Sequence, residues 1–283
     1  MWETELKSYE EALEKGEWHP DAGFISHAHL DHCGYVPFLG DIPLVCSDTT
    51  RALMESLVDV GNLPGFDDEL TCMKRRQVGR YSSRAYFPGE LKVEPGEPQQ
   101  RQIACAGHRE TVSVADGCRV TLFDVGHSIP GSAGCLVESG QSQVVYTGDL
   151  RFHGRSGHNL GDELAGLHPD VILCEGTRID QEEPDDEQQV EEELTEIIEE
   201  AEGLVMVAFA WKDLERYETV KEAALSAGRV PVFDPRLAYL EAQLGDSVYQ
   251  EGGRVFLERS SSMLYSPGDY TRSKHKAGEI PVQ

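Results

Sequence analysis

Short apolar runs separated by glycine-containing turns occupy most of the first 180 residues, and they predict a strand-rich part of the chain. Apolar residues at helical spacing predict a helix at 48–60, with Asp48 as its N-cap, and a short acidic helix at 5–16. The apolar run at 171–174 is continuous, which is typical of a buried strand. The remaining strands are expected at 22–26, 42–46, 111–114, 119–124, 134–138 and 143–147.

The pattern changes after residue 184, where a very acidic helix is expected at 185–202 with its apolar residues on one stripe and its acids toward water. The elements expected next are a strand at 204–210, a helix at 213–227, a strand at 230–233 and a helix at 236–244. Alternation of strands and helices implies a parallel sheet. We therefore predict two domains, residues 1–180 and residues 181–283, with a boundary near 180–185.

The chain carries 51 Asp and Glu residues against 25 Lys and Arg residues, a net charge of −26 in 283 residues. A field of this sign repels nucleic acid and anionic membranes at long range, although it does not forbid a local basic cleft. An acid-rich, lysine-poor surface is typical of adaptation to a salty, halophilic cytoplasm, where salt screens the repulsion. No apolar run approaches the ~20 residues of a membrane helix and no secretory leader is evident, so we expect a cytoplasmic protein.

The seven cysteines are scattered along the chain and include no CxxC pair. In an intracellular chain, such cysteines are typically reduced and buried as small apolar residues. A zinc knuckle built on cysteines is therefore not expected.

Four potential metal ligands lie within six residues, in the sequence HAHLDH at 27–32, at the end of a predicted strand. Such a cluster is costly in a core unless a metal ion satisfies it. His127 and Asp149 each follow a predicted strand, and strand-end loops carry functional groups on a rigid scaffold. A carboxylate at Asp149 could bridge two ions ~3.5–4 Å apart, the spacing used for the hydrolysis of phosphate esters. The candidate metal ligands are His27, His29, Asp31, His32, His127 and Asp149.

This combination of motifs resembles the metallo-β-lactamase superfamily. The stretches around His127, around 148–154 (GDLRFHG) and around 174–178 (CEGTR) are similar to those of its beta-CASP branch of nucleic-acid-processing nucleases, above all the ribonuclease J-like and archaeal metallo-hydrolase members. The resemblance covers residues 20–245. It implies an α/β fold, namely a metallo-β-lactamase αββα sandwich, here incomplete, with a beta-CASP-like parallel α/β segment.

The resemblance also implies a centre for two divalent metal ions, zinc or alternatively manganese. The ions would activate a hydroxide that attacks a phosphodiester bond of nucleic acid, with RNA favoured. The implied catalytic residues are Asp31, which would ligate or orient the water, and Glu175, which falls on the first signature acid of the branch. In the family arrangement, His27, His29 and His127 hold the first ion, Asp31 and His32 hold the second, and Asp149 bridges the two.

Residues beside the metal motifs are candidates for substrate binding. Arg151 and Arg178 could contact backbone phosphates, with pairing to surface carboxylates as the alternative. His153 could approach the site or play a structural role, and the basic stretch at 74–84 could follow a nucleic-acid strand or be a solvated loop. The expected partner is nucleic acid, with no membrane contact. A homo-oligomer, or a partner chain that supplies missing fold elements, stays open.

Two alternative functions stay open because the family's terminal histidines have no clear counterpart here. The only histidine after His168 is His275, which lies in a polar tail. One alternative is a lactamase-fold hydrolase of a small ester or thioester, and the other is a non-catalytic metal-binding subunit or fragment. The inserted α/β segment and Glu175 favour the nuclease over the ester hydrolase, whereas the metal content would distinguish an enzyme from a binding module.

Overall fold

The computed structural model describes ten stretches of the chain. These are residues 20–39, 42–60, 75–79, 90–94, 101–152, 154–155, 160–177, 180, 186–245 and 252–256, with only the backbone described for 75–79 and 90–94. The helix predicted at 5–16 lies outside the described residues, and so does most of the basic stretch at 74–84.

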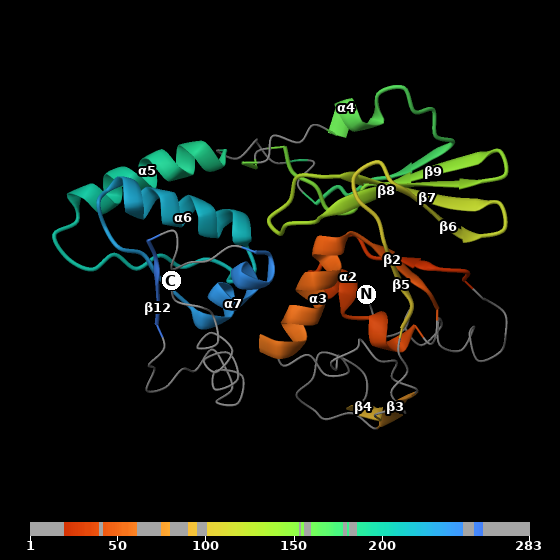
Figure 1. Cartoon of the computed structure of the whole chain (residues 1–283), viewed down its shortest axis with the longest axis horizontal. Coiled ribbons are helices and arrows are strands. Elements are labelled where there is room, and N and C mark those ends of the chain that lie inside the picture. The colour runs from red at the N-terminus through yellow and green to blue at the C-terminus, as the bar shows by residue number, and fades with distance from the viewer. Residues whose placement is uncertain are drawn as a thin grey trace.

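Two β-sheets lie one above the other in the first part of the chain (Figure 1). The first sheet is parallel, in the order β1-β2-β5, and consists of β1 (Gly23–Phe24), β2 (Leu44–Cys46) and β5 (Ile103–Cys105). The second has the order β10-β9-β8-β7-β6 and consists of β6 (Thr111–Ala115), β7 (Cys118–Asp124), β8 (Ala133–Ser139), β9 (Ser142–Tyr146) and β10 (Val171–Leu173). Its strands are antiparallel except for β10, which runs parallel to β9. A separate antiparallel pair joins β3 (Arg75–Gly79) to β4 (Glu90–Glu94).

Side-chain alternation explains how these sheets form layers. In β7, Leu122 packs with Val45 of the first sheet, whereas its neighbour Phe123 points to the opposite face and packs with Leu164. Helix α4 (Leu160–Leu164) therefore covers the outer face of the second sheet, and helix α3 (Asp48–Val60) covers the outer face of the first. The predicted α/β fold with an αββα sandwich is confirmed.

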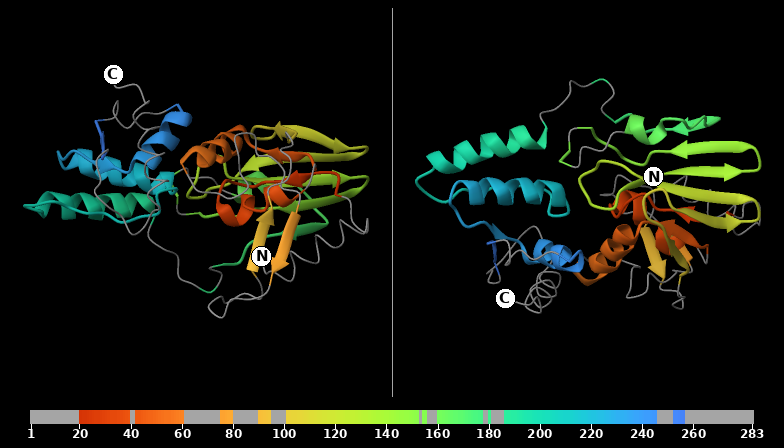
Figure 2. Two further views of the ribbon diagram at one scale, coloured as in Figure 1. Left: turned by 90° about the horizontal axis from the view of Figure 1, so that it is seen from below. Right: turned by 45° about the horizontal axis from the view of Figure 1, so that its top comes forward.

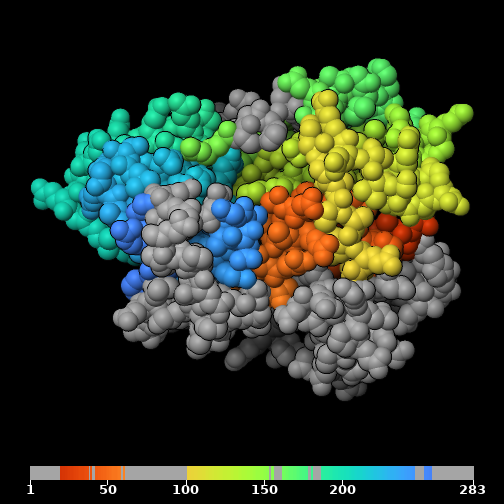
Figure 3. Space-filling view, viewed as in Figure 1, coloured from red at the N-terminus to blue at the C-terminus, as the bar shows by residue number. Residues whose placement is uncertain are grey.

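The second part of the chain packs against the first through a shared apolar core. Leu53 and Leu57 of α3 belong to the same buried cluster as Leu237 and Leu240 of α7, and both views of Figure 2 place the two helices side by side. On the face shown in Figure 3, α3 (orange) lies between α7 (blue) and the yellow residues that begin near 101. The remaining elements are α2 (Leu30–Cys33), η1 (Val36–Phe38), α5 (Glu187–Glu200), α6 (Leu214–Ser226), β11 (Val232–Phe233), α7 (Pro235–Gln243) and β12 (Arg254–Val255), with β11 and β12 parallel.

The N-terminus of α3 corrects one detail of the sequence prediction. The helix spans the predicted residues, but Asp48 is its first helical residue and not its N-cap. The hydroxyl of Ser47 accepts a hydrogen bond from the Thr50 amide at 3.0 Å, so Ser47 is the capping residue. Aspartate and serine are both good caps, and composition alone did not distinguish them.

Two strand predictions were wrong in part, because burial depends on neighbours that a local pattern does not show. The run 171–174 forms β10, but Val171, Ile172 and Leu173 are 48 to 54% exposed because β10 is the edge strand of its sheet. The segment 204–210 joins no ladder among the described residues, and Leu204 is 87% exposed. The expected parallel arrangement of the second part is therefore represented only by β11 and β12 within the described residues.

The described cysteines agree only in part with the prediction of buried thiols, since Cys174 is exposed and Cys105 and Cys118 are half-buried. Cys33, Cys46 and Cys135 are buried and free, and no disulfide joins any pair of the described cysteines. No helix within the described ranges combines the length and the apolar character needed to cross a bilayer.

The shared core predicts that a cavity made in α7 destabilises the whole molecule. Leu240 is fully buried, and we expect Leu240→Ala to lower the free energy of unfolding by about 3 kcal/mol, measured by urea denaturation. The control Leu204→Ala removes the same atoms from an exposed position and should change the free energy by about 0.5 kcal/mol or less. Equal effects of the two substitutions would show that α7 is not part of the common core.

Candidate metal centre

Three separate loops carry the predicted ligands to one place. The first loop follows β1, where the Ile25 amide extends the pairing with β2 by donating to the Val45 carbonyl at 2.9 Å. This pairing carries the chain into the interior, so that His27 is completely buried. The chain then turns into the short helix α2, which places Asp31 and His32 within one turn.

The second loop carries His127 between β7 and β8 and is held by the N-terminus of α3. The hydroxyls of Ser47 and Thr50 donate to the Gly131 carbonyl at 2.7 and 2.9 Å. Gly131 has a φ of +77°, and a Cβ built on it would lie 2.6 Å from the Cβ of Thr49. Only glycine fits this approach, so the cap of α3 fixes the loop that presents His127.

The third loop follows β9 and carries Asp149. Gly148 has a φ of +61°, and a Cβ there would lie 2.8 Å from the Cβ of Ser26, so the loop approaches the first histidine directly. The Arg151 amide donates to the Gly126 carbonyl at 2.7 Å, which ties this loop to the His127 loop. The third loop therefore contacts both of the others.

The ligand atoms form two groups of three within these loops. His27, His29 and His127 form one group, and His27, His32 and Asp149 form the other, with the ligand atoms of each group within 4.8 Å of one another. The Nδ1 atom of His29 lies 3.1 Å from Nε2 of His127. Asp149 Oδ2 lies 3.2 Å from His32 Nε2, 3.9 Å from His127 Nε2 and 4.0 Å from His27 Nε2. One carboxylate oxygen is therefore near members of both groups.

Asp31 lies at the edge of this arrangement. Its side chain is 78% exposed, and Oδ2 lies 3.6 Å from His32 Nε2. It belongs to neither group of three, in which His27 takes the place that the family arrangement gives to Asp31. The roles predicted for Asp31 as a ligand and as a catalytic residue stay predictions.

Burial keeps the central imidazoles neutral. It lowers the pKa of His27 to about 2, with further lowering by the neighbouring histidines, and it lowers the pKa of His127 to about 4. The pKa of His29 is lowered for the same reason. Burial raises the pKa of Asp149, an effect that His32 opposes. Neutral imidazole is the form that binds metal ions, so the histidines are ready to act as ligands.

The donor set fits divalent metal ions. His27 Nε2 is buried and has no hydrogen-bond partner, although buried polar atoms are almost always satisfied. A metal ion bound between the rings would satisfy this nitrogen and separate the imidazoles that crowd around it. Several imidazoles with one carboxylate suit zinc and also manganese or iron.

Ser26 is a site residue that the sequence analysis did not identify. Its hydroxyl is buried and lies 3.1 Å from His27 Nδ1 and 3.3 Å from His32 Nδ1. These contacts orient both rings with Nε2 toward the ligand groups, as outer hydrogen bonds do in metal centres. Its position before His27 is the only signal in the sequence, and a serine beside a histidine is too common to indicate this role.

The structure also places the remaining predicted site residues that it describes. Glu175 accepts a hydrogen bond from the Leu150 amide, directly after Asp149, so it supports the third loop. The guanidinium of Arg151 forms ion pairs with Glu187 at 3.9 Å and with Glu215. Its predicted contact with substrate and the catalytic role of Glu175 stay predictions, whereas His153 and Arg178 lie outside the described residues.

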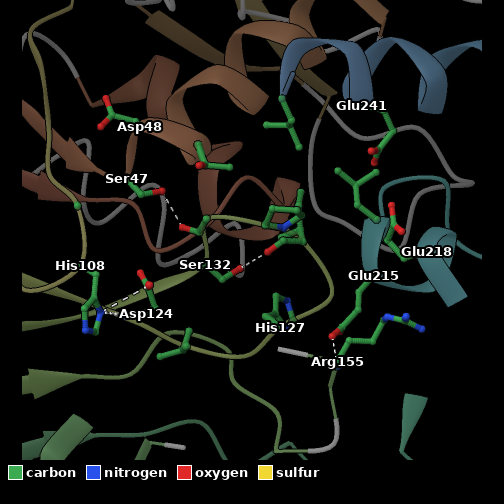
Figure 4. A pocket seen from close by; sticks show the side chains of 18 of the residues that line it. Ser47, Asp48, His108, Asp124, His127, Ser132, Arg155, Glu215, Glu218 and Glu241 are labelled. Carbon is green, nitrogen blue, oxygen red and sulfur yellow. Dashed lines mark hydrogen bonds and ion pairs between the residues drawn. The ribbon is translucent and has the colours of Figure 1, made fainter. Parts of the chain in front are cut away.

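A cavity of about 700 Å³ adjoins the centre on the side of His127. In Figure 4, His127 lies between Ser132 on one side and Glu215 with Arg155 on the other. Among the described side chains that line it, Arg155 is the one arginine or lysine, whereas five carry carboxylates: Asp48, Asp124, Glu215, Glu218 and Glu241. This lining gives no support for phosphate binding inside the cavity.

A family described as "Beta-lactamase superfamily domain" matches residues 10–211, more than half of the chain. The chain therefore belongs to the β-lactamase superfamily. The crystal structure of a protein of unknown function from Enterococcus faecalis V583 covers 88% of this chain with a TM-score of 0.60 at 20% identity, and this chain covers 54% of it. That similarity supports the fold alone.

The curated relatives carry ribonuclease names, in keeping with the resemblance of the motifs. The chain is 28% identical over 238 residues to ribonuclease J of Mycolicibacterium smegmatis. This match covers 80% of this chain and 35% of that protein. It is also 28% identical over 195 residues to an RNase J-like protein of Methanocaldococcus jannaschii, covering 67% of this chain and 40% of that protein. The chain thus spans less than half of the length of either relative.

The glycine in the second loop provides a test of the centre. We expect Gly131→Ala to weaken the affinity for zinc roughly tenfold or more, because the added methyl group pushes the His127 loop away from Thr49. Isothermal titration of the metal-free protein would measure the affinity. Gly140→Ala is the matched control, since Gly140 also has a positive φ of +62° but open space around it. Equal zinc affinity of the two variants would contradict the role of this loop.

The ion pairs beyond the third loop provide a second test, on stability. Glu187 is 2% exposed and accepts hydrogen bonds from Arg216 at 2.7 and 3.0 Å and from Thr219 at 2.7 Å. Burial by itself raises the pKa of Glu187, but these hydrogen bonds outweigh burial and lower it overall. We expect Glu187→Gln to cost about 3 kcal/mol at neutral pH, because Arg216 loses its partner charge.

The effect of Glu187→Gln should depend on pH. The folded pKa of this carboxyl is lowered, so its stabilisation is present above the ordinary value of 4.5 and is lost as the pH falls through the lowered value. Thermal melts of the wild type and the variant should therefore converge below pH 4.5. Glu193→Gln on the exposed side of α5 is the control and should change little at any pH. A constant difference between wild type and Glu187→Gln down to acid pH would contradict the ion-pair interpretation.

Proposed function

We propose that this protein is a metal-dependent nuclease that hydrolyses phosphodiester bonds of nucleic acid, with RNA as the preferred substrate. The observation that carries the proposal is the pair of ligand groups that share His27 and meet at one oxygen of Asp149. The names of the relatives, ribonuclease J and RNase J-like protein, support RNA as the substrate class. The proposed environment is a salt-rich cytoplasm, in keeping with the net charge of −26.

We propose that the centre holds two divalent ions, zinc or, as the alternative, manganese. Bound ions would supply a water molecule with a lowered pKa and would polarise a phosphoryl oxygen. His27, His29 and His127 would hold one ion, and His32 would hold the other. Asp149 would contact both, since its Oδ2 lies within 4.0 Å of nitrogens from both groups.

The protein's own groups position the substrate and the water. Asp31 is in place to accept a proton or orient the water, because its exposed carboxylate lies 3.6 Å from His32 at the open edge of the centre. Glu175 acts by holding the Leu150 amide and so keeps Asp149 in position. We assign both residues to the proposed reaction, Asp31 as the candidate catalytic residue and Glu175 as a positioning residue.

Two carboxylates from the second part of the chain contact the loop that carries Asp149. Glu187 of α5 and Glu215 of α6 pair with Arg151, which lies two residues after Asp149. We propose that these ion pairs hold the Asp149 loop while the substrate binds. A second copy, or a partner chain that adds fold elements, is compatible with the exposed edge strand β10.

The proposed function is tested by metal content and hydrolysis together. The metal-free protein, reloaded with zinc or manganese, should bind two ions per chain and cleave a labelled oligoribonucleotide. Asp149→Ala should lose more than about 99% of this activity, because one carboxylate serves both ions. Glu163→Ala removes a carboxylate that pairs instead with His108 and Arg109, and it is the control expected to retain activity.

The same experiment discriminates the alternatives. Cleavage of a chromogenic ester or thioester without cleavage of RNA or DNA would replace the nuclease by a small-molecule hydrolase. One bound ion or none, with no hydrolysis of any substrate, would indicate a binding subunit. Full activity of Asp149→Ala would contradict the bridging role of that carboxylate.

A further inference from the structure

Two cysteines from different strands lie opposite each other at the ends of β2 and β5. Cys46 and Cys105 are register partners in the parallel ladder, and the Ala106 amide extends this pairing by donating to the Cys46 carbonyl at 3.1 Å. Both side chains lie on one face of the sheet, because Cys46 belongs to the shared apolar core and Cys105 packs against it. Val45 points to the opposite face, where it packs with Leu122. The two thiols are therefore neighbours on the side of the sheet that α3 covers.

This arrangement meets the geometric requirement for a disulfide. Neighbouring strands lie about 4.8 Å apart, and a disulfide joins cysteines whose Cα atoms are about 4.4 to 6.8 Å apart. Both cysteines are free, so the structure shows the reduced state of the pair. Among the cysteines that the structure describes, no other two are register partners in a sheet.

The two thiols differ in their access to solvent. Cys46 is completely buried, whereas Cys105 is half-buried. Burial raises the pKa of both thiols, but a hydrogen bond from Arg51 of α3 opposes this rise at Cys105. The thiolate, and not the thiol, attacks a disulfide. Cys105 is thus the thiol that an oxidant reaches first, and Cys46 is the thiol that completes the bond.

The residues that follow the two cysteines connect this pair to the metal centre. Ser47 and Ala106 both line the cavity that adjoins His127 (Figure 4). The Ser47 hydroxyl caps α3 and donates to the Gly131 carbonyl, and a Cβ built on Gly131 would lie only 2.8 Å from Ser47 Oγ. A shift of Cys46 therefore moves Ser47 and, through this close contact, the loop that carries His127.

We propose that Cys46 and Cys105 are a site of reversible oxidation, at which a low-molecular-weight disulfide converts the two thiols into a protein disulfide that weakens metal binding. The Cys105 thiolate attacks one sulfur of the oxidant, which releases one thiolate and leaves a mixed disulfide. The Cys46 thiolate then attacks the Cys105 sulfur and releases the second thiolate. The protein loses two protons and two electrons, and the oxidant is reduced to two thiols.

The effect on the metal centre follows from the length of the new bond. The two sulfur atoms must close to about 2.05 Å, which draws the ends of β2 and β5 together. Ser47 directly follows Cys46, so its contact with Gly131 is disturbed and the His127 loop is held less firmly. This effect rests on the proposed function, whereas the formation of the disulfide does not.

The first test examines the bond itself. The reduced, metal-free full chain is incubated with glutathione disulfide, and mass spectrometry of proteolytic peptides should identify Cys46 joined to Cys105. Cys118→Ala is the matched control, since Cys118 is also half-buried on a strand but lies opposite Ser139, and this variant should form the bond as the wild type does. Absence of the bond in the oxidised wild type would overturn the inference.

The second test measures the affinity for zinc by isothermal titration. Oxidation should weaken the affinity of the wild type roughly tenfold, and reduction by a phosphine followed by desalting should restore it. Cys105→Ala cannot form the bond, so it should bind zinc like the reduced wild type both before and after the same oxidation. Cys105→Ser takes its place if thermal melting shows that the alanine variant does not fold.

The outcomes distinguish this inference from the proposed function. Equal zinc affinity of the oxidised and the reduced wild type, with the bond formed, would overturn the inference. Weak zinc binding by reduced Cys105→Ala would also overturn it, because the thiols themselves would then be ligands. If the wild type binds metal but forms no disulfide, the inference alone fails. If the disulfide forms but the reduced wild type binds no metal, the proposed function fails, and the effect on the centre fails with it.

Discussion

The crowding of four imidazole rings around one carboxylate is the constraint on which the rest of the structure depends. Ring centres of His27 and His32 lie 4.1 Å apart, those of His27 and His127 4.6 Å apart, and Asp149 Oδ2 lies within 4.0 Å of a nitrogen in each of these three rings. Rings this crowded are not positioned by their own contacts alone, so the scaffold must hold them. The fold meets this requirement with a glycine in each of two loops and with the serine cap of α3, which binds the His127 loop.

The same constraint explains why the second part of the chain packs where it does. Asp149 lies in the loop that follows β9, where the amides of Leu150 and Arg151 donate to Glu175 and to the Gly126 carbonyl. The carboxylates of Glu187 and Glu215 hold Arg151 from α5 and α6, while α7 packs on α3, which holds the other loop. Both loops are thus supported from outside the sandwich, and the α/β segment is part of the frame of the metal centre.

Local patterns in the sequence predicted much of this structure. The differences between prediction and structure come from contacts between residues that are far apart in the chain. The helix 48–60 and the strands of the second sheet follow from spacing alone, and the run HAHLDH at 27–32 already stands out as a cluster of potential ligands. The sharing of His27 by both ligand groups and the role of Ser26 depend on ring orientation, which spacing does not reveal. The exposure of β10 and of 204–210 depends on which strands lie beside them, so an apolar run alone predicted burial wrongly.

The strong negative charge of the chain is compatible with an anionic substrate because the charges act over different ranges. At physiological salt the Debye length is about 8 Å, so distant surface carboxylates are largely screened at the centre. Within that range the imidazoles of His27 and His127 are neutral, and the carboxylates of Asp31 and Asp149 would offset part of the charge of bound divalent ions. The nearby arginines and their glutamates pair with each other and so offset each other's charge. The net negative charge of the whole molecule therefore does not by itself oppose the proposed binding of an anionic substrate at the centre.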